Sequence, residues 1–134
     1  MSKLFRLLLV ALWLTEAVSS GQGDIAAENR AFKGALSAYE DTSWERAERE
    51  FGTFVEKFPN SPLATEAVLH RAQALLNLGR FNEAIPLLEE RKAAAGNQID
   101  RFLYSIGEAR MLSREFTAAA SAFAELIGKF PESM

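Results

Sequence analysis

The sequence predicts an all-α fold made of three consecutive antiparallel helix hairpins, and three observations lead to this prediction. First, one pattern of aromatic, small and apolar residues occurs three times, and its leading residues Trp44, Phe81 and Phe116 are separated by 37 and 35 residues. Second, apolar residues recur at steps of three and four, which is the period of a helix with one buried side. Third, proline and glycine interrupt the pattern between the segments. A period of roughly 35 residues is typical of stacked helix hairpins.

The first hairpin is expected to pair a helix over about residues 24–40 with a second helix over about residues 43–58. Apolar side chains recur along one side of the second helix at Trp44, Ala47, Phe51, Phe54 and Phe58. Thr42 followed by Glu45 predicts a capping box, in which each side chain accepts a hydrogen bond from a free backbone amide. Pro59 should end this helix, because the residue before a proline is pushed out of helical conformation.

The second hairpin is expected to begin at Ser61 and Pro62. Serine is a common N-cap residue, and proline at the first helical position loses no hydrogen bond. This helix should continue to a tight turn at Gly79, which is able to adopt a left-handed conformation. A helix over about residues 82–94 follows, and Gly96 is expected to end it.

The third hairpin is expected to open at Asn97, whose side chain is able to cap the next helix with Asp100 nearby. The chain should turn at residues 113–114. It should close with a helix over about residues 116–130, which repeats the apolar pattern of the first hairpin.

The first 20 residues differ from the rest of the chain. A basic segment precedes an apolar run over residues 7–14, and small residues follow at positions 17–21. This order is typical of a secretory signal peptide, because so short a run spans too little of a bilayer for a stable membrane helix. An uncleaved N-terminal anchor is the alternative, which the polar residues Thr15 and Glu16 disfavour by ending the run early.

The composition fits one globular unit after a signal peptide. The chain has 134 residues, of which 49% are hydrophobic and 25% are charged. We expect residues 1–20 to be the signal peptide and residues 24–134 to form three repeats of about 25–60, 61–96 and 97–133. The absence of cysteine excludes a disulfide framework and a lipid-modified N-terminal cysteine. The net charge of −3 is not concentrated in any run, so we expect no nucleic-acid partner.

Residues of matching size stand at matching places in the three repeats. They are the small residues Ala35, Ala72 and Gly107, the alanines Ala47, Ala84 and Ala119, and the large residues Phe51, Leu88 and Phe123. This pattern resembles the tetratricopeptide repeat family over about residues 25–131. The resemblance implies a right-handed superhelical array, or α-solenoid, in which small residues let paired helices approach and large residues fill the space between hairpins. Arg114 departs from the family pattern, which has glycine at this turn.

The segments over residues 57–62 and 129–133 sharpen the resemblance. They are similar to linkers in a bacterial cell-envelope branch of the family, which includes a periplasmic protein that works with the Tol-Pal system in cell division. A lipoprotein of the outer-membrane barrel-assembly machine is a poorer match, because its anchoring cysteine is missing here. The resemblance implies a periplasmic or secreted scaffold of a Gram-negative-type envelope, used in envelope assembly or maintenance, with no stable membrane anchor after signal cleavage.

The resemblance also implies a groove for a protein or peptide partner. In the family, the first helix of each hairpin lines a concave surface that holds the partner. The residues at these places are Asn29, Phe32, Leu36, Tyr39, Leu69, Gln73, Leu76, Asn77, Arg101, Tyr104, Glu108 and Met111. This mixture favours an apolar or aromatic segment whose backbone bonds to the amide side chains. The alternative for Tyr39, Leu76 and Met111 is packing against neighbouring helices.

The sequence shows no pattern of a catalytic, cofactor or metal site. His70 is the only histidine, and no cysteine or second histidine stands near it to complete a metal site. Ser105, His70 and Asp100 fall on expected helices, without the glycines that surround the nucleophile of a hydrolase. The sequence therefore favours a binding protein over an enzyme.

The last helix raises a second possibility. Ser133 stands where Ser61 stands in the first repeat, at the expected start of another helix. The final helix of a repeat array is normally covered by a further helix, and Phe123, Ile127 and Phe130 would lack this cover. Either the chain is the front part of a longer array, or this edge joins copies of the protein in a homo-oligomer.

Overall fold

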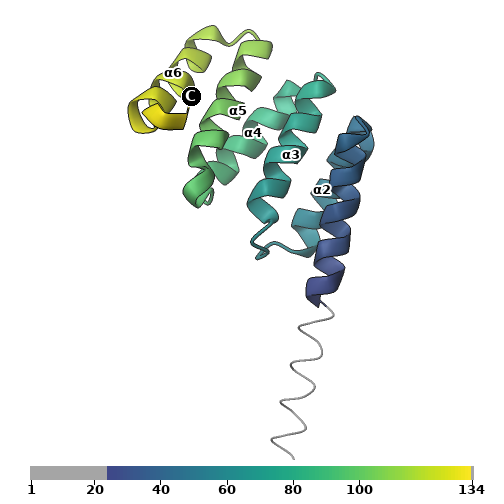
Figure 1. Ribbon diagram of the computed structural model, residues 1–134. Coiled ribbons are helices and arrows are strands. Elements are labelled where there is room, and N and C mark those ends of the chain that lie inside the picture. Colours follow the sequence, from purple (N-terminus) through teal and green to yellow (C-terminus); the bar gives the residue numbers. More distant parts are fainter. Residues whose placement is uncertain (1–23, 134) are drawn as a thin grey trace, which may run out of the picture.

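The computed structural model describes residues 24–133, and every regular element in this range is helical. A helix over residues 24–40 is followed by α2 (Trp44–Lys57), α3 (Ala64–Asn77), α4 (Phe81–Lys92), α5 (Ile99–Leu112) and α6 (Phe116–Lys129). The short 3-10 turns η1 (Gly96–Gln98) and η2 (Pro131–Ser133) precede α5 and follow α6. Figure 1 shows three hairpins stacked in a curved array, with the first helix, α3 and α5 side by side and α2 and α4 behind them. The predicted all-α repeat array is confirmed.

The core contains only apolar side chains, and no polar or charged residue in the described range is buried. Its largest fully buried members are Phe51, Phe54, Phe102, Leu75 and Leu88. Small residues let the helices approach closely, as the sequence pattern predicts. Ala35, Ala47, Ala72, Ala84 and Ala119 are all fully buried. Burial of this apolar surface, at about 25 cal/mol per Å2, is the main force that stacks the hairpins.

The turn inside each hairpin has the same backbone geometry in all three repeats. Thr42, Gly79 and Arg114 have φ angles of 55°, 72° and 65°, so each adopts the left-handed conformation two residues before the next helix. A backbone hydrogen bond to the carbonyl five residues earlier closes each turn, such as the one from Ser43 N to the backbone oxygen of Ala38 at 2.9 Å. The predicted turns at Gly79 and at residues 113–114 are confirmed.

The predicted capping box at Thr42 and Glu45 is wrong. Ser43 is the N-cap residue of α2, and its side chain makes no capping hydrogen bond. Thr42 instead occupies the left-handed turn position, so the turn leads directly into the helix. The backbone bond from Ser43 N satisfies a carbonyl at the end of the preceding helix, and α2 begins without a side-chain cap.

Three other expected helix boundaries also differ from the structure. Helix α3 begins at Ala64 rather than at Pro62, because Ser61 Oγ accepts a hydrogen bond from Leu63 N at 3.0 Å and forms a local turn. Helix α4 ends at Lys92, and Gly96 begins η1 instead of ending the helix. The turn η1 leads into α5, whose N-cap Gln98 makes no side-chain cap, so Asn97 does not cap this helix.

The predicted signal peptide over residues 1–20 lies outside the residues that the structure describes. Among the helices that are described, none is both long and apolar enough to cross a membrane. The expected export of the protein therefore stays a prediction from the sequence.

Candidate functional site

A groove of about 340 Å3 opens across the first helices of the hairpins. We call it the α3–α5 groove. Its lining residues are Tyr39, Leu69, His70, Gln73, Asp100, Arg101, Tyr104, Ser105, Leu126 and Ser133. Five of these, namely Tyr39, Leu69, Gln73, Arg101 and Tyr104, belong to the predicted partner-binding set. They come from three different hairpins, so the helix stacking brings them together.

The floor of the groove is aromatic. The imidazole ring of His70 on α3 stacks on Phe51 of α2, with ring centroids 5.2 Å apart and an angle of 15° between the planes. Tyr39 contacts the same imidazole edge to face at 4.8 Å, and it contacts Trp44 at 5.2 Å. The aromatic rings thus join the first and second hairpins below the groove.

The surroundings of His70 favour its uncharged form. Burial lowers the pKa of His70 below 6.5, because the positive charge is poorly solvated there. The carboxylate of Glu66, whose Oε1 lies 3.6 Å from His70 Nε2, acts in the opposite direction, and Arg101 lowers the pKa further. No cluster of three metal-binding side chains occurs within residues 24–133. The imidazole of His70 thus adds an aromatic ring to the lining of the groove.

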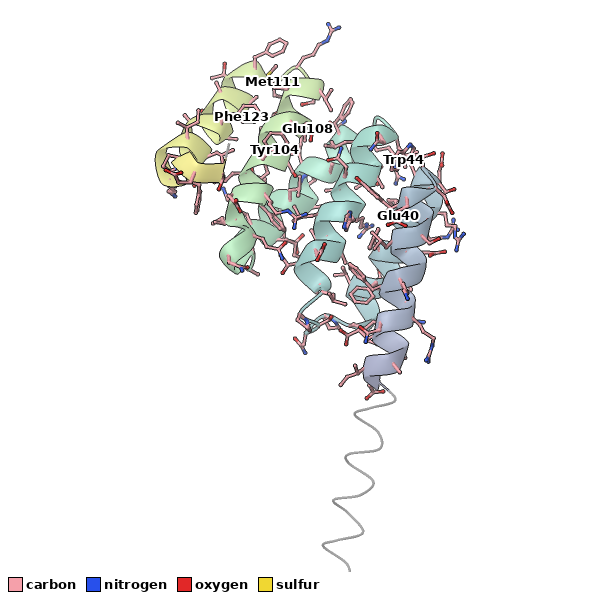
Figure 2. All side chains as sticks on the ribbon, in the orientation of Figure 1. Glu40, Trp44, Tyr104, Glu108, Met111 and Phe123 are labelled. Carbon is pink, nitrogen blue, oxygen red and sulfur yellow. The ribbon has the colours of Figure 1, made fainter. Side chains whose placement is uncertain are left out.

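Tyr39 keeps its proton at physiological pH. Burial raises the pKa of its hydroxyl above 10.0, and the carboxylate of Glu108 raises it further. Glu108 lies on α5 between Tyr104 and Met111, and Figure 2 shows these three residues along the same helix. Tyr39 thus offers the groove a neutral hydroxyl that is able to donate a hydrogen bond.

The wall of the groove on α5 is accessible to solvent. Tyr104 is 55% exposed, and Arg101 is exposed as well. Met111 is 48% exposed further along α5, but it does not line the groove. Gln73 on α3 is half-buried and faces the same groove. These positions present aromatic, apolar and polar groups directly to solvent.

Several members of the predicted set serve mainly the core. Leu69 lines the groove but is only 6% exposed, and Leu76 is 5% exposed and lies outside the lining. Phe32 contacts Phe51 and Phe54 edge to face, with centroid distances of 5.7 Å and 5.4 Å, and Leu36 packs against the same cluster. Phe32 thus holds the first hairpin together, and its truncation would test stability rather than binding.

The two asparagines of the predicted set lie on exposed surface beyond the groove lining. Asn29 is exposed near the start of the first helix. Asn77 is exposed at the end of α3, where its Nδ2 donates a hydrogen bond to the backbone oxygen of Gln73 at 2.8 Å. The side chain of Asn77 is therefore engaged with its own helix.

The apolar edge predicted on α6 is only partly accessible. Ile127 is 50% exposed, whereas Phe123 and Phe130 are half-buried. The ring of Phe123 lies against Gly107 of α5 and contacts Tyr104 edge to face at 6.1 Å. Phe116, at the start of α6, is 60% exposed and was missing from the predicted edge. The sequence alone does not reveal that Phe116 is exposed, because it stands at the same position of the repeat as Trp44 and Phe81, which are half-buried.

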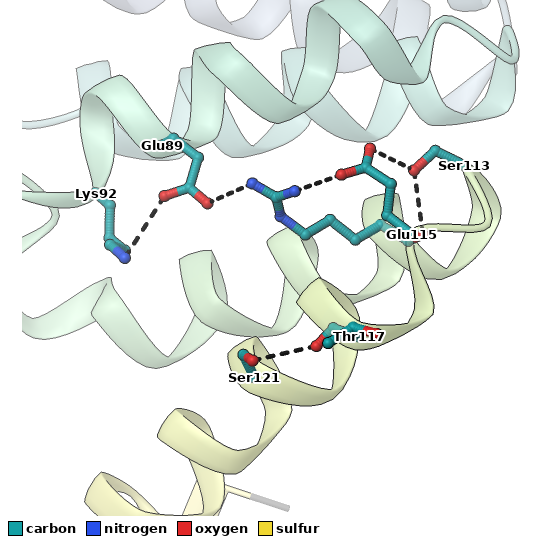
Figure 3. Close-up of polar contacts among 7 residues, drawn as sticks. Glu89, Lys92, Ser113, Glu115, Thr117 and Ser121 are labelled. Atoms are coloured by element: carbon teal, nitrogen blue, oxygen red, sulfur yellow. Dashed lines mark hydrogen bonds and ion pairs between the residues drawn. The ribbon is translucent and has the colours of Figure 1, made fainter.

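A chain of ion pairs connects the last three helices (Figure 3). Arg110 of α5 donates hydrogen bonds to Glu89 of α4 at 3.1 Å and to Glu115, just before α6, at 2.6 Å. Glu89 also pairs with Lys92 at 3.5 Å, and Ser113 Oγ donates to Glu115 at 3.0 Å. The network fixes how the second and third hairpins meet, although partly exposed pairs contribute only about 0–1 kcal/mol each.

Comparisons with known proteins agree with the repeat architecture. One tetratricopeptide repeat family model matches residues 32–99, and a second one matches residues 102–133. No curated protein matches the sequence. The first match alone covers half of the chain and spans the hairpins on both sides of the aromatic floor. The chain therefore belongs to the tetratricopeptide repeat family.

Proposed function

We propose that this protein is an exported scaffold of the bacterial cell envelope that binds a segment of a partner protein in the α3–α5 groove. Tetratricopeptide repeats mediate protein–protein interactions, and the family is generally a non-enzymatic scaffold. One observation carries the proposal. The exposed ring of Tyr104 stands beside a groove of about 340 Å3 with an aromatic floor.

The groove has the chemistry to bind an extended apolar or aromatic segment. Tyr104 and the aromatic floor offer apolar contact to a partner side chain, and aromatic residues often dominate binding energy. Gln73, Ser105 and Asp100 surround this surface and are able to bond to amides of the partner's backbone. Extended segments are recognised in this way, by apolar pockets together with backbone hydrogen bonds.

Site-specific crosslinking in cells tests the location of binding. A photoreactive amino acid at position 104 should form a covalent adduct with one partner protein. The same amino acid at Asn82, which is exposed on α4, should not form this adduct. Equal crosslinking at both positions would show that binding does not use the groove.

The contribution of the groove is then measured with the partner that is captured. Tyr104→Ala should weaken binding by about tenfold to a hundredfold, the range for an exposed aromatic contact. Asn82→Ala is the matched control and should bind as the unchanged protein does. An affinity that survives Tyr104→Ala in a folded protein contradicts the proposal.

Export and envelope function rest on the N-terminal pattern and on the linker resemblance. Mass spectrometry of the protein from a Gram-negative host should find an N-terminus after residue 19, 20 or 21, and fractionation should recover it with periplasmic proteins. Association with the Tol-Pal system, which the resemblance suggests, predicts that the adduct at position 104 contains a component of that system. An uncleaved protein in the cytoplasm would refute this part of the proposal.

The exposed edge of α6 favours a second candidate function, which is self-association. Phe116 and Ile127 are 60% and 50% exposed on the same helix. If α6 pairs with another copy, light scattering over a concentration series should show a dimer or larger assembly, and Ile127→Asp should return it to a monomer. Leu112→Asp, at a residue 49% exposed at the end of α5, is the control. A monomer at all concentrations would exclude this function.

A further inference from the structure

A second groove lies between the first helix and α2, on the outer face of the first hairpin. Its volume is about 360 Å3, and we call it the first-hairpin groove. Phe54 forms part of its floor, and the small residues Ala31 and Gly34 of the first helix leave room above the ring. The large apolar side chains that are strongly exposed in the described part of the chain all lie outside this groove.

Three basic side chains border the first-hairpin groove. Arg30 comes from the first helix, and Arg49 and Lys57 come from α2. Arg49, Thr53 and Lys57 follow one another at four-residue steps, so they lie along one side of α2. Within residues 24–133, none of the three basic groups has an ion-pair partner within 4.0 Å.

Basic side chains outnumber acidic ones along the groove. Glu50 is the only acidic side chain among the lining residues, and its Oε1 accepts a hydrogen bond from Arg46 at 2.6 Å. Glu48 points to the other side of α2, where it pairs with Arg71 of α3 at 2.8 Å and with Arg80 at 3.5 Å. The lining of the first-hairpin groove therefore combines small and apolar residues with three basic side chains and one carboxylate.

We propose that the first-hairpin groove docks an acidic segment of a partner protein. An apolar side chain of that segment packs on Ala31 and Gly34, above the buried ring of Phe54, and its carboxylates pair with Arg30, Arg49 and Lys57. Arginine is well suited to this role, because its planar guanidinium binds a carboxylate through two hydrogen bonds. This site is separate from the α3–α5 groove and shares no lining residue with it.

The shape of the groove favours a protein segment over an anionic membrane. A membrane-binding surface inserts protruding apolar side chains into the lipid. Here the apolar floor is recessed, since Phe54 is only 1% exposed. A partner side chain that projects into the groove is able to pack on Ala31 and Gly34 above this ring, whereas a flat lipid surface does not enter the groove.

Peptide binding to the purified protein tests the proposal. The probe is a short fluorescein-labelled helical peptide with glutamates and leucines along one side, and the control peptide has glutamine in place of glutamate. Fluorescence anisotropy should show that the glutamate peptide binds at least about fivefold more tightly than the control. The difference should shrink when the salt concentration rises from about 0.05 M to about 0.5 M, because salt screens exposed charges.

Three variants locate the binding. Arg49→Glu should weaken binding of the glutamate peptide by about fivefold or more. Arg114→Glu makes the same change of charge at an exposed arginine of the third hairpin and should leave the affinity unchanged. Ala31→Trp fills the groove without changing any charge, and it should weaken binding by about tenfold. Circular dichroism of each variant confirms that the helices are intact.

Several results would overturn the proposal. Equal loss of affinity in Arg49→Glu and Arg114→Glu would mean that only the net charge attracts the peptide. Full affinity in Ala31→Trp would show that the groove is not where the apolar side chain sits. Binding to phosphatidylglycerol vesicles, without binding to the glutamate peptide, would assign this face to a membrane surface instead.

Discussion

Replacing Gly107 by alanine tests how closely α5 and α6 approach each other. The Cβ atom of alanine would lie 2.6 Å from Cε1 and Cζ of Phe123 and 2.9 Å from Cδ1. Carbon atoms pack at about 3.5–4.0 Å, so the ring or the helix must move by about 1 Å. Moving the ring also disturbs its edge-to-face contact with Tyr104.

Two opposing effects determine the change in stability. Alanine is favoured over glycine inside a helix by about 1 kcal/mol. Overpacking costs about 1–3 kcal/mol, and a weakened aromatic pair costs about 0.5–1.5 kcal/mol. We therefore expect Gly107→Ala to lower the free energy of unfolding by about 1–2 kcal/mol. This is the opposite of what the repeat pattern suggests, because Ala35 and Ala72 stand at the same place in the other repeats.

Urea unfolding followed by circular dichroism measures the change, and the Phe123→Ala background provides the control. Without the ring there is room for the methyl group, so Gly107→Ala should then raise the free energy of unfolding by about 1 kcal/mol. The sign of the effect should thus depend on Phe123. If alanine stabilises the protein while Phe123 is present, the close approach does not limit the packing of these helices.

Three further changes test other parts of the fold. Thr42→Gly should raise the free energy of unfolding by about 0.5–1 kcal/mol, because a β-branched residue is strained in the left-handed turn; urea unfolding that shows no gain would contradict this. Stability should fall as the pH drops through 6.5, because the unfolded chain protonates its histidine before the folded chain protonates the buried His70. Urea midpoints measured across this pH range should show the fall in stability for the unchanged protein but not for His70→Gln. A fall that persists in His70→Gln would assign the pH dependence to another group. Phe102→Ala should cost about 3–5 kcal/mol in the same assay, because it leaves a cavity at a fully buried position.

The period of the apolar residues predicts the helices well, but the residues near their ends predict the boundaries less well. Trp44, Phe81 and Phe116 each begin a helix, as the repeat pattern indicates. The predicted side-chain caps at Thr42 and Asn97 do not form, because Thr42 adopts the left-handed turn conformation and Asn97 lies within a 3-10 turn. These turns are closed by backbone hydrogen bonds, which almost any residue type is able to form.

The sequence identified only some of the residues that line the α3–α5 groove, because the burial of each residue depends on the surrounding helices. Helical period places Leu69 and Tyr104 on corresponding sides of α3 and α5, yet the first is buried and the second is exposed. The difference comes from the neighbouring helices that cover α3, and a single sequence does not reveal this cover. The first-hairpin groove was missed altogether, because its basic residues Arg30 and Arg49 come from different helices and form no charge run.

The central place of α3 has a consequence for hydrogen exchange. Helix α3 contacts α2, α4 and α5, and seven of its residues are buried, including Leu75 and Ala72. In a linear stack each hairpin is stabilised by its neighbours, so the end hairpins are able to open while the centre stays closed. The amides of α3 should therefore exchange with solvent only when the whole array unfolds, whereas those of α6 exchange through openings confined to the last hairpin.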